Sequence, residues 1–203
     1  MRIGLFGGTF DPPHHGHLLA ASDAFEALAL DRLVWIPAAQ QPLKVGLPSA
    51  PAADRLAMTR LAVGDDARFT VDAVEIERAG LSFSVDTVEG YVRARPGDEL
   101  IVLLGADVLA TFARWKEPRR LALLARLAIL HRAVDGAPVE EAAITGAMTA
   151  ITGPGVPAPV VLETRRVDLS STEIRERARA GRSLHGFVPE AVARYIRERA
   201  LYR

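Results

Sequence analysis

The chain lacks cysteine entirely, and this absence excludes two kinds of chemistry. Without thiols there is neither a disulfide framework nor a cysteine nucleophile. Net charge is lacking as well, because 25 basic residues balance 25 acidic residues and leave a formal charge of +0 at pH 7. This balance argues against a general nucleic-acid binder and against a protein held at a membrane by charge, although it is compatible with local basic patches.

Long hydrophobic runs are also absent. No apolar run approaches the length of a transmembrane helix, and the sequence begins with a strand-like segment and not with a signal peptide. We therefore expect a cytoplasmic protein with neither nucleic acid nor membrane as a partner. A length of 203 residues suits one α/β domain with a sizeable core, so we expect a single domain over residues 1–203.

What the sequence does have is a distinctive first stretch, residues 2–17. Residues 3–6 are a short apolar run typical of a buried strand, and the two glycines after it permit a tight turn and a close backbone approach. Two prolines then exclude helix until apolar residues with helical spacing begin. A helix N-terminus after a glycine turn favours bound anions, and His14 and His17 are close enough in sequence to face the same one.

Two other interpretations of this stretch stay open at this point. A glycine turn with a structural histidine is common, and a histidine cluster at residues 14–17 could instead bind a metal ion. The metal interpretation is the weaker one, because the stretch does not supply the set of cysteine and carboxylate ligands that a closed metal site needs.

Residues 7–17 resemble a known signature. They match GGTFDPxHxGH, which is typical of the nucleotidyltransferases of the HxGH superfamily in the form found in bacterial nicotinate mononucleotide adenylyltransferases. In that superfamily the two histidines and the glycine between them contact the triphosphate of ATP. The resemblance therefore implies an ATP site made by Gly7, Gly8, Thr9, Phe10, His14, Gly16 and His17.

A loop over residues 38–49 contains Lys44, one of only two lysines in a chain whose other 23 basic residues are arginines. A solvated surface lysine is the simplest explanation. However, Pro37-x4-Pro42-x-Lys44 is similar to the family's PxxxxPxK loop, in which the basic residue reaches bound phosphates. The resemblance favours a functional lysine.

Two further segments resemble the family's site for the nicotinate ring. Residues 82–87, Ser-Phe-Ser-Val-Asp-Thr, are similar to the family's S-Y-T-x-D-T, where hydroxyl and backbone groups hold the nicotinate carboxylate. Ser84 falls in this motif, although ordinary helix capping would also explain it. Residues 105–115 match GxDxLxxFxxW, so Trp115 corresponds to the tryptophan that stacks on the pyridine, and the backbone N–H of Lys116 to a carboxylate donor. Polar neighbours favour this role over a place in the core.

The second of these segments follows the most apolar strand that the sequence predicts, residues 99–104. Ligands of open parallel sheets lie beyond the carboxyl ends of the strands, so Gly105 and Asp107 are well placed to contact ATP. An aspartate at a helix start is explained equally well as an N-cap, and the sequence leaves both explanations open.

Another informative motif lies at residues 167–175. Ser170 and Glu173 form a Ser-x-x-Glu capping box, so a helix is expected to begin here and to run to Gly181. Capping does not explain three consecutive hydroxyls followed by an arginine one helical turn later. The stretch resembles the family's ISSTxIR motif, which implies a second phosphate site in a C-terminal helical part, about residues 168–203, that completes the ATP site. The implied residues are Ser170, Ser171, Thr172 and Arg175.

The alternation of strand and helix patterns predicts a doubly wound, mostly parallel α/β sheet, and the resemblance implies the Rossmann-like nucleotidyltransferase fold. Strands are expected at residues 3–6, 33–36, 69–76, 99–104, 127–130 and 160–162. Helices are expected at 16–28, 51–63, 108–112, 121–125, 140–151, 170–181 and 190–199, and a further helix is expected to begin within residues 81–88 and to run to about residue 95. In the helix over 51–63 we expect Leu56, Met58, Leu61 and Ala62 to face inward, and Arg55 stands where the family has an arginine.

The resemblance implies a reaction: AMP is transferred from ATP to nicotinate mononucleotide, with deamido-NAD and pyrophosphate as products. The implied catalytic residues are His14, His17, Lys44 and Arg175, and the implied acceptor site is Gly8, Thr9, Lys44, Ser84, Trp115 and Lys116. Mg²⁺ is expected to arrive with ATP, because protein-bound Mg²⁺ usually keeps waters and substrate oxygens as ligands. We expect no acidic side chain to face the acceptor's ring.

Three other functions are weighed against this one. A phosphopantetheine adenylyltransferase usually lacks both the first motif and the Trp115 region, whereas an enzyme preferring nicotinamide mononucleotide is harder to exclude. A non-catalytic nucleotide sensor would be expected to have lost His14, His17 or Arg175, and all three are present. The sequence leaves a homo-oligomer open.

Overall fold

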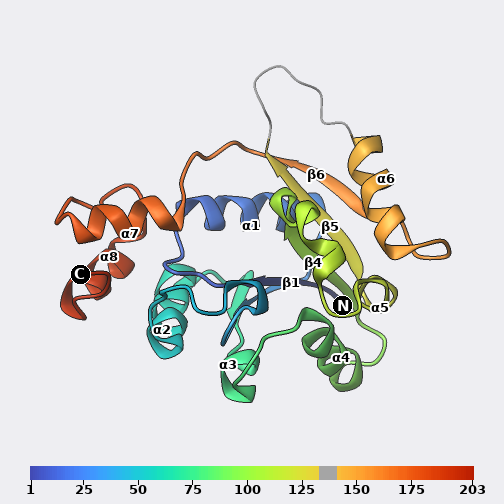
Figure 1. Cartoon of the computed structure of the whole chain (residues 1–203), viewed down its shortest axis with the longest axis horizontal. Coiled ribbons are helices and arrows are strands. Elements are labelled where there is room, and N and C mark those ends of the chain that lie inside the picture. Colours follow the sequence, from blue (N-terminus) through green and yellow to red (C-terminus); the bar gives the residue numbers. More distant parts are fainter. Residues whose placement is uncertain (133–140) are drawn as a thin grey trace.

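The computed structural model describes residues 1–132 and 141–203, and a parallel sheet forms the centre of this part of the chain (Figure 1). Its strands are β1 (Arg2–Gly8), β2 (Arg32–Pro37), β3 (Phe69–Val71), β4 (Glu99–Gly105), β5 (Arg126–Arg132) and β6 (Val160–Thr164). Their order is β3-β2-β1-β4-β5-β6, and every neighbouring pair is parallel. The predicted doubly wound fold is confirmed. The strand order reverses between β1 and β4, which is where such sheets bind ligands.

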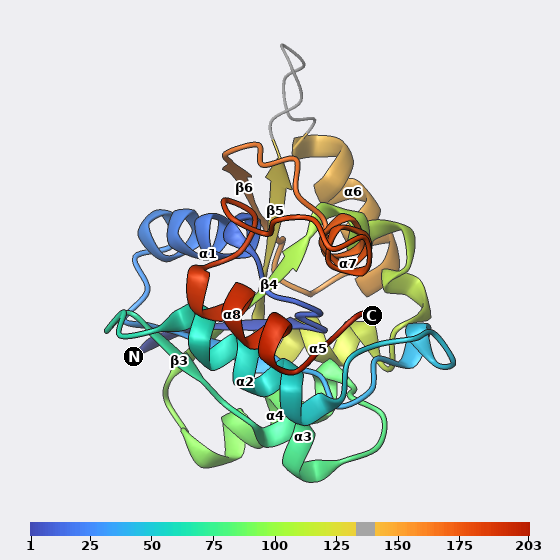
Figure 2. The same ribbon diagram turned by 90° about the vertical axis from the view of Figure 1, so that its left-hand side faces the viewer.

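Helices cover both faces of the sheet (Figure 2). On one face lie α1 (His15–Ala27) and α2 (Ala52–Val63), and on the other α4 (Ser84–Ala94), α5 (Pro118–Leu124) and α6 (Glu141–Thr152). Because successive side chains of a strand point to opposite faces, the buried strands supply both cores. Leu5 packs toward α4 and α5, whereas Phe6 beside it packs toward α1.

The last two helices have a core of their own. Helices α7 (Ser171–Arg179) and α8 (Glu190–Glu198) pack on α2 and not on the sheet, around residues such as Met58, Ile174 and Val192. Ser170 caps α7 as predicted, because its hydroxyl accepts the N–H of Glu173 at 3.1 Å. In Figures 1 and 2 both helices lie at the end of the molecule next to α2.

The prediction of a strand over residues 69–76 is wrong in its second half. β3 ends at Val71, and a short helix, α3 (Val74–Arg78), follows. Asp72 causes the change, because its Oδ1 accepts the N–H of Val74 at 2.9 Å and its Oδ2 accepts the hydroxyl of Tyr91. A side chain that satisfies a free backbone N–H favours a helix start over a continued strand.

Two smaller predictions are also corrected. The segment after β4 is not an α-helix over 108–112 but two 3₁₀ turns, η2 (Ala106–Ala110) and η3 (Phe112–Arg114), a geometry common in short connections. In α2, Met58 and Ala62 are buried as expected, but Leu61 is 38% exposed, because the helix packs only one stripe of side chains against its neighbours.

A third 3₁₀ turn, η1 (Pro42–Lys44), lies in the loop after β2. Residue 140, where α6 was expected to begin, lies outside the described residues.

No helix in the described ranges is long and apolar enough to cross a membrane.

Candidate active site

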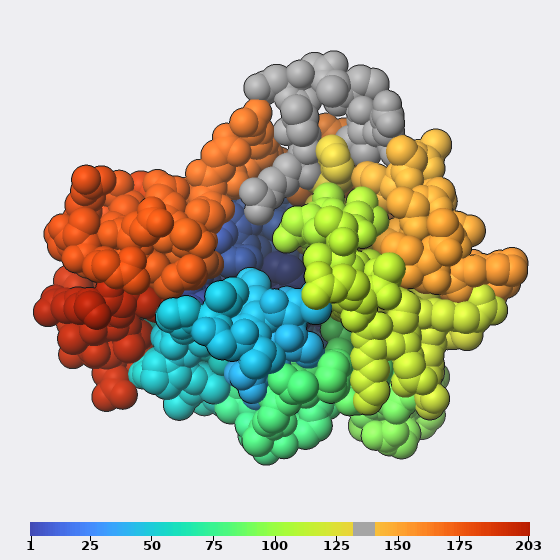
Figure 3. Space-filling view, in the orientation of Figure 1, coloured from blue at the N-terminus to red at the C-terminus, as the bar shows by residue number. Residues whose placement is uncertain are grey.

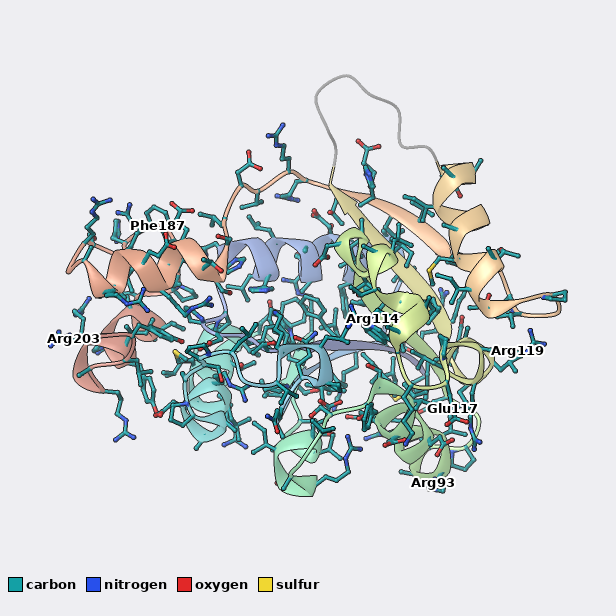
Figure 4. The ribbon with its side chains drawn as sticks, in the orientation of Figure 1. Arg93, Arg114, Glu117, Arg119, Phe187 and Arg203 are labelled. Carbon is teal, nitrogen blue, oxygen red and sulfur yellow. The ribbon has the colours of Figure 1, made fainter. Side chains whose placement is uncertain are left out.

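A pocket opens at the carboxyl ends of β1, β2 and β4, on the edge where the strand order reverses. Besides these strands, Thr9 and three further segments line it: residues 41–43, 82–84 and 114–116. Figure 3 shows the hollow, with the blue N-terminal residues as its floor between the cyan residues after β2 and the yellow-green residues after β4. In Figure 4, Arg114 lies near the centre of the molecule on this same side.

The first motif turns sharply at the end of β1. Phe10 has a left-handed backbone (φ 49°), and its side chain, 2% exposed, points into the core. Its ring packs 5.5 Å from that of Phe6 and 5.1 Å from that of Trp35. The Phe10 side chain therefore anchors the turn, and Phe10 itself does not line the pocket.

The two histidines of the motif lie against each other at the start of α1. The backbone N–H of His14 donates to Nδ1 of His17 at 3.2 Å, and the two ring centroids are 3.8 Å apart. A neutral His17 that accepts through Nδ1 carries its proton on Nε2. A Cβ on Gly16 would come within 3.0 Å of the His14 ring, so this ring position requires a glycine there. The structure thus brings His14, Gly16 and His17 together, as the spacing suggested.

A buried arginine, Arg55 on α2, holds the surrounding loops in place. Its guanidinium donates to four backbone carbonyl oxygens, those of Thr9 (2.8 Å), Ala38 (2.6 Å), Ala39 (2.7 Å) and Ala50 (3.1 Å). The side chain is 2% exposed, and burial lowers the pKa of the guanidinium while the nearby Asp11 opposes this shift. From the sequence we noted the family's arginine here but gave it no role, because its partners come from two separate connections, those after β1 and after β2.

The C-terminal motif lies directly against the first motif. Nη1 of Arg175 donates to the backbone oxygen of Asp11 at 2.9 Å, and the hydroxyl of Ser171 donates to the backbone oxygen of Pro12 at 2.9 Å. Nη2 of Arg175 donates to the hydroxyl of Thr172 at 3.1 Å. The two segments predicted to bind phosphate, which are more than 150 residues apart in sequence, are therefore neighbours in space.

Five of the six predicted acceptor residues line the pocket itself. Ser84 is the first residue of α4, so the N-terminus of that helix lies on the lining. Trp115 is half-buried with its ring 5.4 Å from that of Phe112. The Nζ of Lys116 is 2.7 Å from Asp86, so an ion pair joins the tryptophan segment to the first turn of α4. Gly8 and Thr9 complete the group of predicted acceptor residues on the lining.

Lys44, Gly105 and Asp107 also lie outside this lining, as do the histidines of the first motif and the predicted residues of the C-terminal motif. Lys44 is exposed on η1, next to the lining residues 41–43. Asp107 is exposed in η2, and a Cβ on Gly105 would come within 2.5 Å of its carboxylate oxygen, so the glycine gives that carboxylate room. Within the described residues 105–110, the N-cap of η2 is Gly105 and no side chain caps the turn. Asp107 therefore does not act as the N-cap there.

An acidic side chain that was not predicted also lines the pocket: Glu75, on α3. It is 6% exposed, and its carboxylate accepts the hydroxyl of Thr87 at 2.6 Å and a hydrogen bond from Ser82. Burial raises its pKa above the usual value for glutamate. We expected no acidic side chain here, because the strand predicted over 69–76 hid the turn that brings Glu75 to the pocket.

Within residues 1–132 and 141–203, no group of three histidine, cysteine or acidic side chains is placed to hold a metal ion.

Comparison with known proteins agrees with this geometry. Residues 5–177 match a family model described as cytidylyltransferase-like. The chain is 54% identical to a Gemmatimonas aurantiaca protein, in a match that covers 100% of this chain and 93% of that protein. It is 48% identical to a Thermus thermophilus protein, in a match that covers 100% of both. Both are named "Probable nicotinate-nucleotide adenylyltransferase".

A solved structure shows the same fold. It is a Plasmodium falciparum nicotinic acid mononucleotide adenylyltransferase complexed with NaAD, with a TM-score of 0.79 and 15% identity. The match covers 99% of this chain and 97% of that one.

Arg55→Met should destabilise the protein strongly, because it leaves four buried carbonyl groups without their donor. We expect a loss of about 3 kcal/mol or more in the free energy of unfolding, measured by denaturant titration. The matched control is Arg60→Met on the exposed side of the same helix, which should change stability by about 0.5 kcal/mol at most. Equal denaturation midpoints for the two variants would contradict this role.

Glu75→Gln should change how stability depends on pH. The folded protein holds the Glu75 proton to higher pH than the unfolded chain does, so wild type loses stability as pH rises above the ordinary glutamate pKa, about 4.3. Glutamine does not titrate. The variant should therefore gain stability relative to wild type between pH 4 and pH 8, as thermal unfolding would measure. Glu77→Gln, on the exposed side of α3, is the control, and a pH-independent difference for Glu75→Gln would refute the burial effect.

Proposed function

The chain belongs to the cytidylyltransferase-like family and, within it, to the nicotinate-nucleotide adenylyltransferases, and we propose that it transfers AMP from ATP to nicotinate mononucleotide. The products are deamido-NAD and pyrophosphate. The observation that carries this proposal is the contact between the two segments predicted to bind phosphate, residues 11–17 and 171–175, beside a pocket lined by the half-buried Trp115.

The donor side of the site is made for a triphosphate. His14 and His17 lie at the first turn of α1, where the N–H groups and the helix dipole favour negative charge. Arg175 adds a guanidinium and Thr172 a hydroxyl from the first turn of α7. We assign the β- and γ-phosphates to this region, with Ser170 and Ser171 holding the helix start that faces them.

The acceptor side suits an aromatic ring that carries a carboxylate. Trp115 offers a ring face, and the backbone N–H groups near Ser84 and Lys116 offer donors for the carboxylate. The Lys116 side chain is engaged with Asp86, so its backbone and not its ammonium is the group assigned to the ligand. The carboxylate of Glu75 is already bonded to Thr87 and Ser82, which turns its hydrogen-bonding capacity away from the ring.

The reaction needs alignment more than acid–base chemistry. The acceptor's phosphate is largely dianionic near neutral pH, since its second pKa is about 6. One of its oxygens forms a bond to the α-phosphorus of ATP, the bond from that phosphorus to the bridging oxygen breaks, and pyrophosphate leaves. His14, His17, Lys44 and Arg175 would stabilise the negative charge that grows on the α-phosphate and on the leaving group.

The residues fit a Mg²⁺ ion that is carried by the nucleotide. The groups near the predicted phosphates are histidines, arginine, lysine and N–H donors, while the Asp11 carboxylate is occupied by protein donors. Such a set binds anions and leaves the metal to phosphate oxygens and water. When bound, Mg²⁺ neutralises phosphate charge. The cytoplasmic location remains a prediction, and the oligomeric state is left open.

A direct assay tests the proposal. Purified protein is mixed with ATP, Mg²⁺ and one candidate acceptor at a time, and pyrophosphate release is measured. We expect rapid release with nicotinate mononucleotide. Release only with phosphopantetheine, or ATP binding without release from any acceptor, would overturn the assignment.

His17→Ala should leave the fold intact and lower turnover by roughly a hundredfold or more, as does the loss of one hydrogen-bond donor that stabilises charge in the transition state. Steady-state kinetics and a thermal melt would measure both effects. The control is His185→Ala, an exposed histidine between α7 and α8. Near-normal turnover in a folded His17→Ala variant would remove this histidine from the catalytic set.

The acceptor site should discriminate strongly between nicotinate and nicotinamide mononucleotides. The amide's NH₂ would face backbone donors, a mismatch that should cost about a thousandfold or more in kcat/KM. Trp115→Ala should raise the KM for the acceptor far more than that for ATP, because stacking touches only the pyridine. Comparable kcat/KM for the two mononucleotides would contradict the specificity, and an unchanged acceptor KM would return Trp115 to a packing role.

A further inference from the structure

The segment after α8 returns to the first motif. Tyr202 is half-buried, and its hydroxyl donates to Oδ1 of Asp11 at 2.6 Å, across 191 positions of sequence. Figure 4 shows its neighbour Arg203 at the end of the molecule formed by α7 and α8. No motif in the sequence pointed to this contact.

The Asp11 carboxylate is shared among several groups. Its Oδ1 also accepts the N–H of Ala50 at 3.2 Å, and its Oδ2 lies 3.9 Å from Nη1 of Arg175. That same Nη1 donates to the backbone oxygen of Asp11 at the shorter distance of 2.9 Å. Arg175 therefore bonds to the Asp11 carbonyl and to Thr172, while Tyr202 and Ala50 both donate to Oδ1 of the carboxylate and its Oδ2 faces Arg175.

We propose that Tyr202 is a positioning residue for ATP binding: by holding the Asp11 carboxylate it keeps the Arg175 guanidinium available to the triphosphate. This rests on the proposed function. Asp11 is only 4% exposed, and a buried carboxylate that loses a donor draws in the nearest cation. Without the Tyr202 hydroxyl, that cation is Arg175, which would close onto Asp11 and turn away from the phosphates.

The chain offers a matched control for this hydroxyl. Tyr195 on α8 donates its own hydroxyl to a second buried aspartate, Asp54, at 2.8 Å. Asp54 lies on α2 and contacts Arg199, outside the pocket. Tyr202→Phe and Tyr195→Phe therefore remove the same group from the same kind of partner, and only the first is linked to Arg175.

The experiment measures ATP binding by calorimetry with Mg²⁺ and no acceptor. We expect Tyr202→Phe to raise the Kd for ATP about fivefold or more, while Tyr195→Phe leaves it unchanged. The KM for the acceptor should stay at the wild-type value in both variants, because the inferred effect acts only through Arg175 on ATP. A damaged fold would instead weaken the binding of both substrates. Melting temperatures should fall by similar amounts.

A double-mutant cycle gives the second measurement. In an Arg175→Ala background, Tyr202→Phe should have no further effect on the Kd for ATP, since the residue on which it acts is gone. An unchanged Kd in Tyr202→Phe, an equal change in Tyr195→Phe, or a full additional loss in the Arg175→Ala background would each overturn the inference. Failure of the wild-type protein to bind ATP would instead overturn the proposed function.

Discussion

The site depends on one interaction, the binding of four backbone carbonyl oxygens by the Arg55 guanidinium. Where β1 and β2 end, their loops turn away from the sheet and lose the hydrogen bonds that the ladder supplied. Carbonyl groups buried in this way are costly unless a donor reaches them. An arginine can satisfy several at once because its donors form a rigid planar fork.

Helix α2 transmits this constraint to the rest of the molecule. Arg55 faces the strand ends, while Asp54, its neighbour in sequence, accepts hydrogen bonds from Tyr195 and Arg199 of the C-terminal part. One turn of α2 thus joins the sheet to the separate core in which α7 and α8 pack. This arrangement brings Arg175 beside the first motif although the C-terminal helices have no core contact with the sheet. The acceptor pocket, by contrast, is built by elements that pack directly on the sheet.

The regular parts of this arrangement could be predicted because local patterns encode them. Apolar runs identified the strands, and the hydroxyl cap identified the start of α7. Features made by distant partners could not be predicted in this way. Phe10 turned into the core because its backbone adopts a left-handed conformation, and Glu75 reached the pocket because Asp72 ended β3 early. The roles of Arg55 and Asp11 depend on contacts between separate loops, which no spacing in the sequence reveals.

The central claim is that the two anion-binding segments and the pocket act on one pair of substrates, so that the acceptor's phosphate attacks ATP directly. The most direct measurement uses ATP labelled at its α-phosphate. The account predicts that label enters a dinucleotide product only when nicotinate mononucleotide is present, and that denatured protein carries none. Label bound covalently to the protein, or transferred to product without that acceptor, would contradict it.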